Sequence, residues 1–284
     1  MNKILALVNL ELKRNSRFYL IYIGLFVSFM VGGNVSRINS ILKEYKLSPN
    51  ESSIKYQIDT YGGVSFGESI LGINRFPLII TTLGILGLLV YSIYIWIREY
   101  TESNKTIYTL LSIPENRFSI YISKMISSVT MVHGYILIMT IGLIMSKVIF
   151  NIKFKGIEIL KTSIGNDLNS YYNLSLNTLR RMIPMDFYNY ITTYGFMLVA
   201  GLSILFTITI LFISYKNSEK LPIVVIIVFI LSLMYLKIRF SIGLYIVLKA
   251  SIIGKLGVDI LVDSLTILIM GFISYKLLNK KIAI

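Results

Sequence analysis

The sequence predicts an all-α polytopic membrane protein, and three observations indicate this class. Of the 284 residues, 55% are hydrophobic and 15% are charged, and the mean hydropathy is +0.72. Such a composition is too apolar for an ordinary soluble domain. Several uncharged stretches also approach the length of about 20 residues that a helix needs to cross a hydrocarbon core roughly 30 Å thick. We therefore expect a single transmembrane domain over residues 1–284.

Six transmembrane helices are predicted, each bounded by charged residues. They cover residues 18–36, 76–97, 125–146, 187–215, 221–236 and 257–275. The fifth is short, and lysine side chains at its ends can extend to the interface. Between the spans lie three expected outer loops, 37–75, 147–186 and 237–256. The last loop contains apolar pieces too short to cross, which predicts short re-entrant helices before the last span.

The N-terminal residues 1–17 have the pattern of an amphipathic interfacial helix. One face would carry Ile4, Leu5, Val8 and Leu12, and the other Lys13, Arg14 and Arg17. A frayed basic terminus is the alternative. The basic residues before the first span favour a cytoplasmic N-terminus, and six spans then place the C-terminus on the same side.

Aromatic residues gather at two expected span boundaries, as in an interfacial belt. The first group is Tyr91, Tyr94, Trp96 and Tyr100, and the second is Tyr188, Tyr190 and Tyr194. The net charge of +14 does not indicate nucleic-acid binding, because the basic residues flank membrane spans and would contact anionic lipid. The chain has no cysteine and one histidine, which excludes disulfides and a histidine-rich metal site.

The segment 98–124, between the second and third spans, is the most informative part of the chain. Leu110 and Leu111 belong to the apolar side of a short predicted helix, which Pro114 ends. Ser112 and Glu115 then have the spacing of a capping box that starts a new helix. The sequence thus predicts a cytoplasmic helix, a sharp corner and a helix leading into the third span. A solvated loop helix without a partner is the alternative.

A family resemblance rests on this segment. In order, its residues are Glu99, Glu102, Thr106, Leu110, Leu111, Pro114, Arg117 and Lys124. This order is similar to that of permeases of the second ABC-exporter (ABC-2 type) family, and most similar to the branch for peptide-toxin export and bacteriocin immunity. In the family, the segment is the coupling helix that sits in a groove of the ATPase subunit. Lys105 and Asn104 stand where the family commonly has Gly and Glu, so the charge pairing with the ATPase can differ here.

The resemblance implies a permease subunit of an ATP-driven exporter in the bacterial cytoplasmic membrane, with both termini cytoplasmic. Two copies of a separate ABC ATPase would dock on residues 101–114, and a second permease copy or homologue would complete a dimer. The expected substrate is amphipathic, with a peptide toxin or antimicrobial peptide favoured, so the role would be peptide transport or antimicrobial peptide resistance. The chain itself would be no enzyme and hold no cofactor, since ATP and magnesium belong to the partner.

Two other functions remain open. A non-transporting immunity or sensor scaffold could bind a peptide through residues 37–75 and 147–186. A membrane-embedded enzyme on lipid-linked substrates would need clustered acids, and only Asp259 and Asp263 come close. The G-x-S-x-G match at residues 63–67 lacks the context of a nucleophile elbow, because the single histidine, His133, falls in the middle of a predicted span and no Asp lies between it and Ser65. A phosphate-loop-like match at residues 62–69 has Glu68 in place of the lysine, which excludes an ATP site there.

Two further sets of residues are candidates within the spans. A possible intramembrane polar site consists of His133, Asp259 and Asp263. His133 could relay protons or simply be packed across helices, and the two acids could hold a cation or pair with Lys249, Lys255 or Arg239. Gly24, Ser28 and Gly32 recur every fourth residue, which suits either a subunit interface or packing within the chain.

Overall fold

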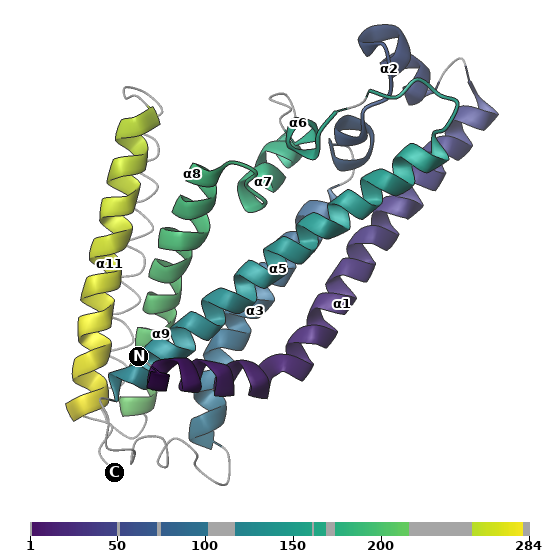
Figure 1. Cartoon of the computed structure of the whole chain (residues 1–284). Helices are drawn as coiled ribbons and strands as arrows, with labels where there is room; N and C mark the ends of the chain where they lie inside the picture. Colours follow the sequence, from purple (N-terminus) through teal and green to yellow (C-terminus); the bar gives the residue numbers. More distant parts are fainter. Residues whose placement is uncertain are drawn as a thin grey trace. The chain divides into compact units, whose positions relative to one another are not determined.

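The computed structural model describes residues 2–49, 52–72, 75–101, 117–160, 162–168, 174–215 and 252–280. Its elements, drawn in Figure 1, are α1 (Asn2–Leu47), α2 (Ser53–Tyr61), the π-helix η1 (Gly67–Gly72), α3 (Phe76–Thr101), α5 (Phe118–Lys153), α6 (Ile164–Asp167), α7 (Leu174–Met182), α8 (Phe187–Tyr190), the π-helix η2 (Ile191–Met197), α9 (Leu198–Tyr215) and α11 (Ile252–Lys280). The prediction of an all-helical protein is confirmed for these residues.

Five helical stretches of the described part are long and apolar enough to cross a membrane. They are Ile4–Leu47, Phe76–Arg98, Phe118–Lys153, Phe187–Ser214 and Asp259–Asn279. Each contains or overlaps one predicted span, as a multi-pass membrane protein requires. The fifth predicted span, residues 221–236, lies outside the described residues, as do residues 237–251 of the predicted re-entrant segment. The remainder of that segment differs from expectation, because α11 runs without a break from Ile252 into the last span.

The chain divides into two compact units. The first comprises Met1–Asn15, Leu88–Met131 and Tyr190–Ile284, and the second comprises Ser16–Gly87 and Val132–Asn189. The helices α1, α3 and α5 each contribute residues to both units.

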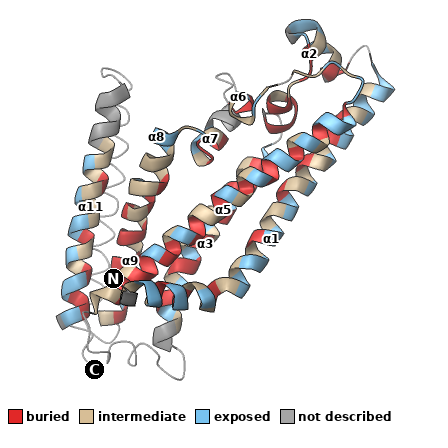
Figure 2. Ribbon diagram, in the orientation of Figure 1, coloured by how far each residue is buried: buried red, intermediate tan, exposed pale blue. Residues whose placement is uncertain are grey.

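Helix α1 corrects two boundaries of the sequence analysis. It is one helix of 46 residues, so the N-terminal helix 1–17 is not separate from the first span, and residues 37–47 are helical rather than loop. At about 1.5 Å per residue the helix is roughly 69 Å long, which exceeds a hydrocarbon core of roughly 30 Å. Exposed and buried positions alternate along α1 (Figure 2). Of the predicted apolar face, Val8 is buried and Leu5 is 55% exposed, and two polar residues, Glu11 and Asn15, are buried as well.

In the second unit, small residues allow close packing of α1, α3 and α5. The Tyr22 hydroxyl donates to the Gly84 carbonyl at 2.6 Å, and Tyr135 donates to Ile80 at 3.2 Å. A Cβ at Gly84 would overlap the Tyr135 hydroxyl. A buried amide, Asn34, donates to Ser146 on α5 at 3.1 Å. Glycine is therefore required at the helix crossing so that tyrosine hydroxyls can reach backbone carbonyls.

The two long predicted loops, 37–75 and 147–186, fold together in the second unit into a body that we term the loop assembly, made by α2, η1, α6, α7 and a parallel bridge between Val64 and Ile159. Val64 donates to the Glu158 carbonyl at 2.8 Å and accepts from Leu160 at 3.1 Å. A small apolar core supports this contact: Ile54, Val64, Phe66, Ile70, Phe150, Phe154, Leu168, Leu179 and Ile183 are all buried. The predicted loops are thus largely ordered.

The turn from the loop assembly into α8 is capped by Asp186. Its carboxylate accepts from the Asn189 amide at 2.9 Å and from the Asn189 side chain at 2.8 Å. Partial burial acts to raise the pKa of Asp186, but the hydrogen bonds from Asn189 and the charge of Arg180 together lower it below the usual 3.8.

Replacing Asp186 with alanine should therefore lower the free energy of unfolding by about 1 kcal/mol, because the cap is lost. The part of this contribution that depends on the charge of the carboxylate should be fully present above pH 3.8 and be lost as the pH falls through the lowered folded-state pKa. Thermal unfolding in micelles at pH 7 and at pH 3 measures this, and an Asp186→Asn variant keeps the cap without the titration. Equal losses for Asp186→Ala at both pH values would contradict the assignment.

Candidate functional site

Lys124 is the most deeply buried cation of the described residues, and it lies in the first unit two turns into α5. Its side chain is 0% exposed. The Nζ atom is 2.8 Å from Glu11 Oε1 on α1 and 5.3 Å from the ring centroid of Trp96 on α3. An ammonium removed from water requires such compensation by a carboxylate and an aromatic face. Lys124 therefore joins three helices at one point.

Glu11 accepts from a second cation through its other oxygen. Arg14 Nη2 lies 2.8 Å from Glu11 Oε2, one turn along α1. The Glu11 side chain is 5% exposed, whereas that of Arg14 is 27% exposed and reaches the surface. Since both carboxylate oxygens are engaged, Glu11 is held in one orientation.

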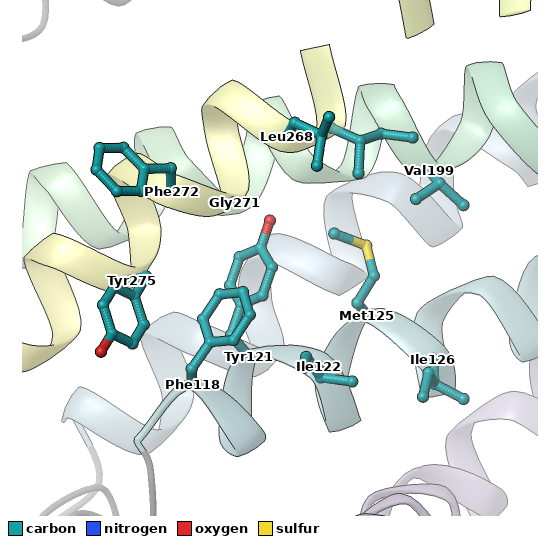
Figure 3. Close-up of a pocket in the computed structure, with 11 residues that line it drawn as sticks. Phe118, Tyr121, Ile122, Met125, Ile126, Val199, Leu268, Gly271, Phe272 and Tyr275 are labelled. Atoms are coloured by element: carbon teal, nitrogen blue, oxygen red, sulfur yellow. The ribbon is translucent and has the colours of Figure 1, made fainter. Parts of the chain in front are cut away.

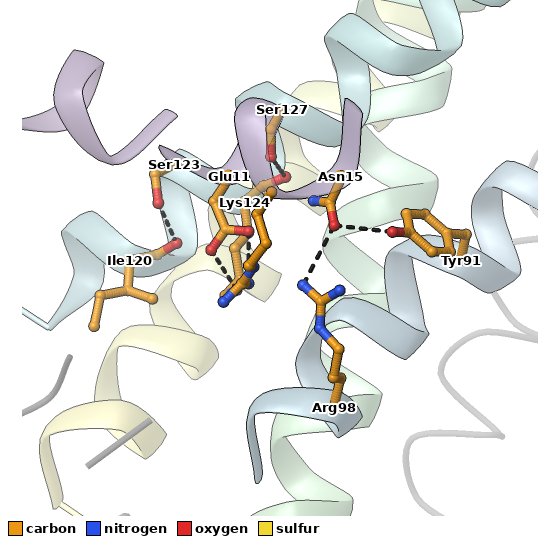
Figure 4. Close-up of polar contacts among 9 residues, drawn as sticks. Glu11, Asn15, Tyr91, Arg98, Ile120, Ser123, Lys124 and Ser127 are labelled. Atoms are coloured by element: carbon orange, nitrogen blue, oxygen red, sulfur yellow. Dashed lines mark hydrogen bonds and ion pairs between the residues drawn. The ribbon is translucent and has the colours of Figure 1, made fainter. Parts of the chain in front are cut away.

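Next to this pair, Asn15 links α1 to α3. Its Oδ1 accepts from the Tyr91 hydroxyl at 2.9 Å and from Arg98 Nη2 at 3.3 Å (Figure 4). Asn15 is 1% exposed and follows Glu11 by four residues, so both point to the same side of α1. We call Glu11, Asn15, Tyr91, Arg98 and Lys124 the anchor cluster.

Arg117 makes a separate link at the start of α5. Its Nη1 donates to the carbonyl of Leu278 at 3.3 Å, near the C-terminal end of α11. The last carbonyls of a helix lack intrahelical donors and carry partial negative charge, so a guanidinium is favoured there. The Arg117 contact fixes the beginning of α5 to the last predicted span.

An aromatic cluster packs beside the anchor cluster in the same unit. The ring centroid of Trp96 lies 5.7 Å from Phe206 and 6.5 Å from Tyr121. Trp96 is 1% exposed and Tyr91 9% exposed, which corrects the prediction that they belong to an interfacial belt. Among the described residues of the first group, only Tyr94 is exposed enough for such a belt. In the second group, Tyr188 is exposed as well.

The predicted ATPase-coupling residues fall into three groups. Glu102, Thr106, Leu110, Leu111 and Pro114 lie outside the described residues. Glu99 is in the last described turn of α3. Arg117 and Lys124 are described, and they contact α11 and α1 rather than lying free on a surface. Because the Lys124 side chain is fully buried, its contacts in this conformation are with Glu11 on α1 and Trp96 on α3.

The predicted intramembrane polar residues belong to different units. His133 is half-buried on the part of α5 that belongs to the second unit, whereas Asp259 and Asp263 lie on α11 in the first. Asp263 is buried and Asp259 half-buried. Lys249 and Arg239, two of the proposed partners of these acids, lie outside the described residues. Across the described ranges, no group of three or more His, Cys, Asp or Glu side chains could hold a metal ion.

The small-residue stripe of α1 lies in the second unit and carries no contact at its glycine Cβ positions. Gly24, Ser28 and Gly32 are exposed, and a Cβ at either glycine would meet nothing within 4 Å. Neither the subunit interface nor packing within the chain is tested by this exposure, so both stay predictions for these positions. Gly33 is the glycine that packs, since a Cβ there would overlap the ring of Phe76.

Sequence reasoning missed Glu11 and Asn15. One signal was available, because Glu11 is the only acidic residue before Glu44 and stands in a basic, apolar stretch. A lone acid in such a stretch needs a cationic partner. Its partner Lys124 lies 113 residues away, and nothing in the local pattern identifies it.

Comparison with known proteins adds no relative: no protein-family model, curated protein or solved structure matches the chain.

Proposed function

We propose that this chain is the permease subunit of an ATP-driven ABC exporter in a bacterial cytoplasmic membrane. A separate ATPase would dock on residues 101–114, with both termini on the same, cytoplasmic side. Two permease subunits, identical or homologous, would form the pathway. The favoured cargo is an amphipathic peptide, either a toxin or an antimicrobial peptide.

The strongest support comes from how the flanks of residues 102–116 are held. Arg98 before this segment and Lys124 after it are both bonded to α1, and Arg117 is bonded to the end of α11. Charged contacts of this kind resist displacement of the helix ends. A force on residues 102–116 would therefore move α3 and α5 as a whole rather than only rearrange the ends of these two helices. Both helices also contribute residues to the second unit, which gives the motion a covalent route there.

The coupling then follows from differential binding. Closure of the ATPase dimer would favour the permease conformation in which residues 101–114 fit the closed groove. The equilibrium between conformations would shift by the difference in affinity of the ATP-bound partner for the two states. ATP and magnesium would act only on the partner subunit. The chain would contribute the docking helix and the helices α3 and α5, which transmit the movement.

The leading test is association with the ATPase. Leu110→Asp should abolish co-purification of the ATPase in mild detergent, because a carboxylate cannot be buried in an apolar groove without a partner. Leu110→Met is the matched control and should co-purify normally, since it preserves apolar volume. Recovery of the ATPase with Leu110→Asp at the unsubstituted yield would contradict the proposal.

The orientation has its own test, made simple because the chain contains no cysteine. Thr106→Cys should react with a membrane-impermeant maleimide only after the cytoplasmic face is opened. Tyr56→Cys, at a position 66% exposed in the loop assembly, should react in intact cells. Labelling of Thr106→Cys from outside would exclude any contact with a cytosolic ATPase.

The loop assembly favours one second candidate, a non-transporting scaffold that binds a peptide. This ordered body presents an exposed aromatic side chain at Tyr56. Two more exposed aromatic residues, Phe187 and Tyr188, directly follow the second loop in sequence, at the start of α8. Reconstitution separates the two functions: ATP-dependent peptide movement supports the exporter, and peptide binding without an ATPase supports the scaffold.

A further inference from the structure

An apolar cavity of about 430 Å³ lies within the first unit, between the beginning of α5 and the second half of α11. From α5 it is lined by Phe118, Tyr121, Ile122, Met125 and Ile126, from α11 by Ile267, Leu268, Gly271, Phe272 and Tyr275, and from α9 by Val199. Figure 3 shows Met125 extending from α5 toward α11 and Val199 beside it. Carbon and sulfur atoms dominate this lining, which suits a hydrocarbon chain and disfavours water.

The cavity opens where the protein would meet lipid. Among its lining residues, Leu268 is 69% exposed, Phe272 58% and Tyr275 41%. All three lie on α11, within the stretch long and apolar enough to cross a membrane. An acyl chain could therefore enter laterally without crossing a polar surface.

Gly271 creates the space on the α11 side. A Cβ at this position would come no closer than 3.9 Å to any side chain, and that neighbour is Phe118. No packing constraint thus requires glycine here, although glycine in a helix interior is less stable than alanine by roughly 0.5–1 kcal/mol. An unfilled position that weakens the helix is consistent with a space kept for another molecule.

A cation stands at one end of the cavity. The exposed Lys276 places its Nζ 4.5 Å from the ring centroid of Phe272, one turn from it on α11. Arg117 lies near the same end of α11, bonded to Leu278. Basic residues at the mouth of a cleft between membrane helices favour an anionic headgroup. Lys276 is the one of the two that faces solvent.

We propose that this cavity binds one acyl chain of an anionic phospholipid whose phosphate is held by Lys276. A zwitterionic lipid offers the same chain but no net charge for the lysine, so the site discriminates by headgroup. The site requires only that the chain lies in a membrane, and it does not depend on transport. A lipid held at α5 and α11 would sit directly on the helix that follows Arg117 and contains Lys124.

The single tryptophan of the chain is a built-in reporter of this site. Trp96 is 1% exposed, so bulk lipid quenches it poorly, yet its ring centroid is 6.5 Å from that of Tyr121 in the cavity wall. The full chain is reconstituted in phosphatidylcholine vesicles that contain increasing fractions of brominated phosphatidylglycerol, or of brominated phosphatidylcholine. Tryptophan quenching by the brominated chains is then compared at equal mole fractions.

The brominated phosphatidylglycerol should reach half-maximal quenching at about a fivefold lower mole fraction, as expected for one lysine at a lipid surface. Gly271→Leu should remove the saturable quenching by filling the cavity. Gly201→Leu is the matched control, because Gly201 is on α9 in the same unit with nothing within 4 Å of its Cβ position and does not line the cavity.

Lys276→Gln provides the independent second variant. It should abolish the headgroup preference while leaving quenching by both lipids, whereas Lys153→Gln, at an exposed lysine of the second unit, should change neither. Equal quenching by the two brominated lipids in the unsubstituted protein would overturn the proposal. A preference that survives Lys276→Gln would overturn it as well, even if Gly271→Leu failed to fold.

Discussion

Lys124→Ala should lower the free energy of unfolding by about 3–5 kcal/mol, as removal of one partner from a buried ion pair typically does. The substitution removes the ammonium that pairs with Glu11 Oε1 from a carboxylate only 5% exposed, and it removes the cation from the face of Trp96. It also leaves a cavity where a fully buried side chain stood. Unfolding in micelles with increasing sodium dodecyl sulfate, followed by the fluorescence of Trp96, measures the loss.

Three controls define the origin of this effect. Glu11→Gln should be similarly damaging, because Lys124 is then buried without its carboxylate. The double variant Glu11→Gln/Lys124→Met should recover much of the loss, since no fully buried charge is left unpaired, Arg14 reaches the surface and the volume is kept. Lys153→Ala, at an exposed lysine bonded to Asn39, should stay within about 0.5 kcal/mol of the unsubstituted protein. Additive effects of the two single changes would mean that the ion pair is energetically unimportant.

The same variants bear on coupling. If Lys124 positions α5 so that it responds to the ATPase, the Glu11→Gln/Lys124→Met variant should bind the ATPase normally. Its transport activity should nevertheless be stimulated less by substrate. Leu110→Asp should instead lose the ATPase altogether. Under the proposed function, docking would depend on residues 101–114 and transmission on the anchor cluster, so the two sets of variants would separate them.

The sequence allowed good prediction of α3 and α9, where charged residues bound a long apolar run. The predicted span 76–97 corresponds to Phe76–Thr101, and 187–215 corresponds to Phe187–Tyr215 with a π-helix inside. Hydropathy works there because backbone groups in a membrane must be satisfied within the helix. The π-helix η2 has no comparable signal in the sequence.

Prediction failed for α1 because charge was taken as the end of a helix. Arg37 ends an uncharged run, but the helix continues to Leu47 with Ile38 and Ile41 buried. Hydropathy indicates which residues favour lipid, but it does not indicate where a helix ends. A helix ends where its regular backbone hydrogen bonds end. For α1 this is just before Ser48 and Pro49. The pairing within the anchor cluster was unpredictable for another reason, namely that it joins residues far apart in sequence.

Asp167→Ala should unfold the loop assembly locally, with a loss of about 3–5 kcal/mol to the local free energy of opening. The carboxylate is 0% exposed, and it accepts from Lys147 Nζ and from the Thr162 hydroxyl. Its removal leaves a lysine that is only 13% exposed without a counter-charge. Hydrogen exchange should show lost protection in η1, whose Gly67 packs against the Asp167 backbone.

Asp167→Asn is the sharper variant, because it keeps the shape and the acceptor for Thr162 and removes only the charge. Lys147→Met added to it should restore protection, as no unpaired ammonium then remains. Unchanged exchange in residues 67–72 for both single variants would show that the core of Val64, Phe66 and Ile70 suffices to hold the assembly.

Asp167 and the anchor cluster lie in different units, so variants at the two places can separate the two candidate functions. Peptide binding that is lost with Asp167→Ala but retained in the anchor variants would favour the scaffold. Transport lost in the anchor variants, with peptide binding intact, would favour the exporter.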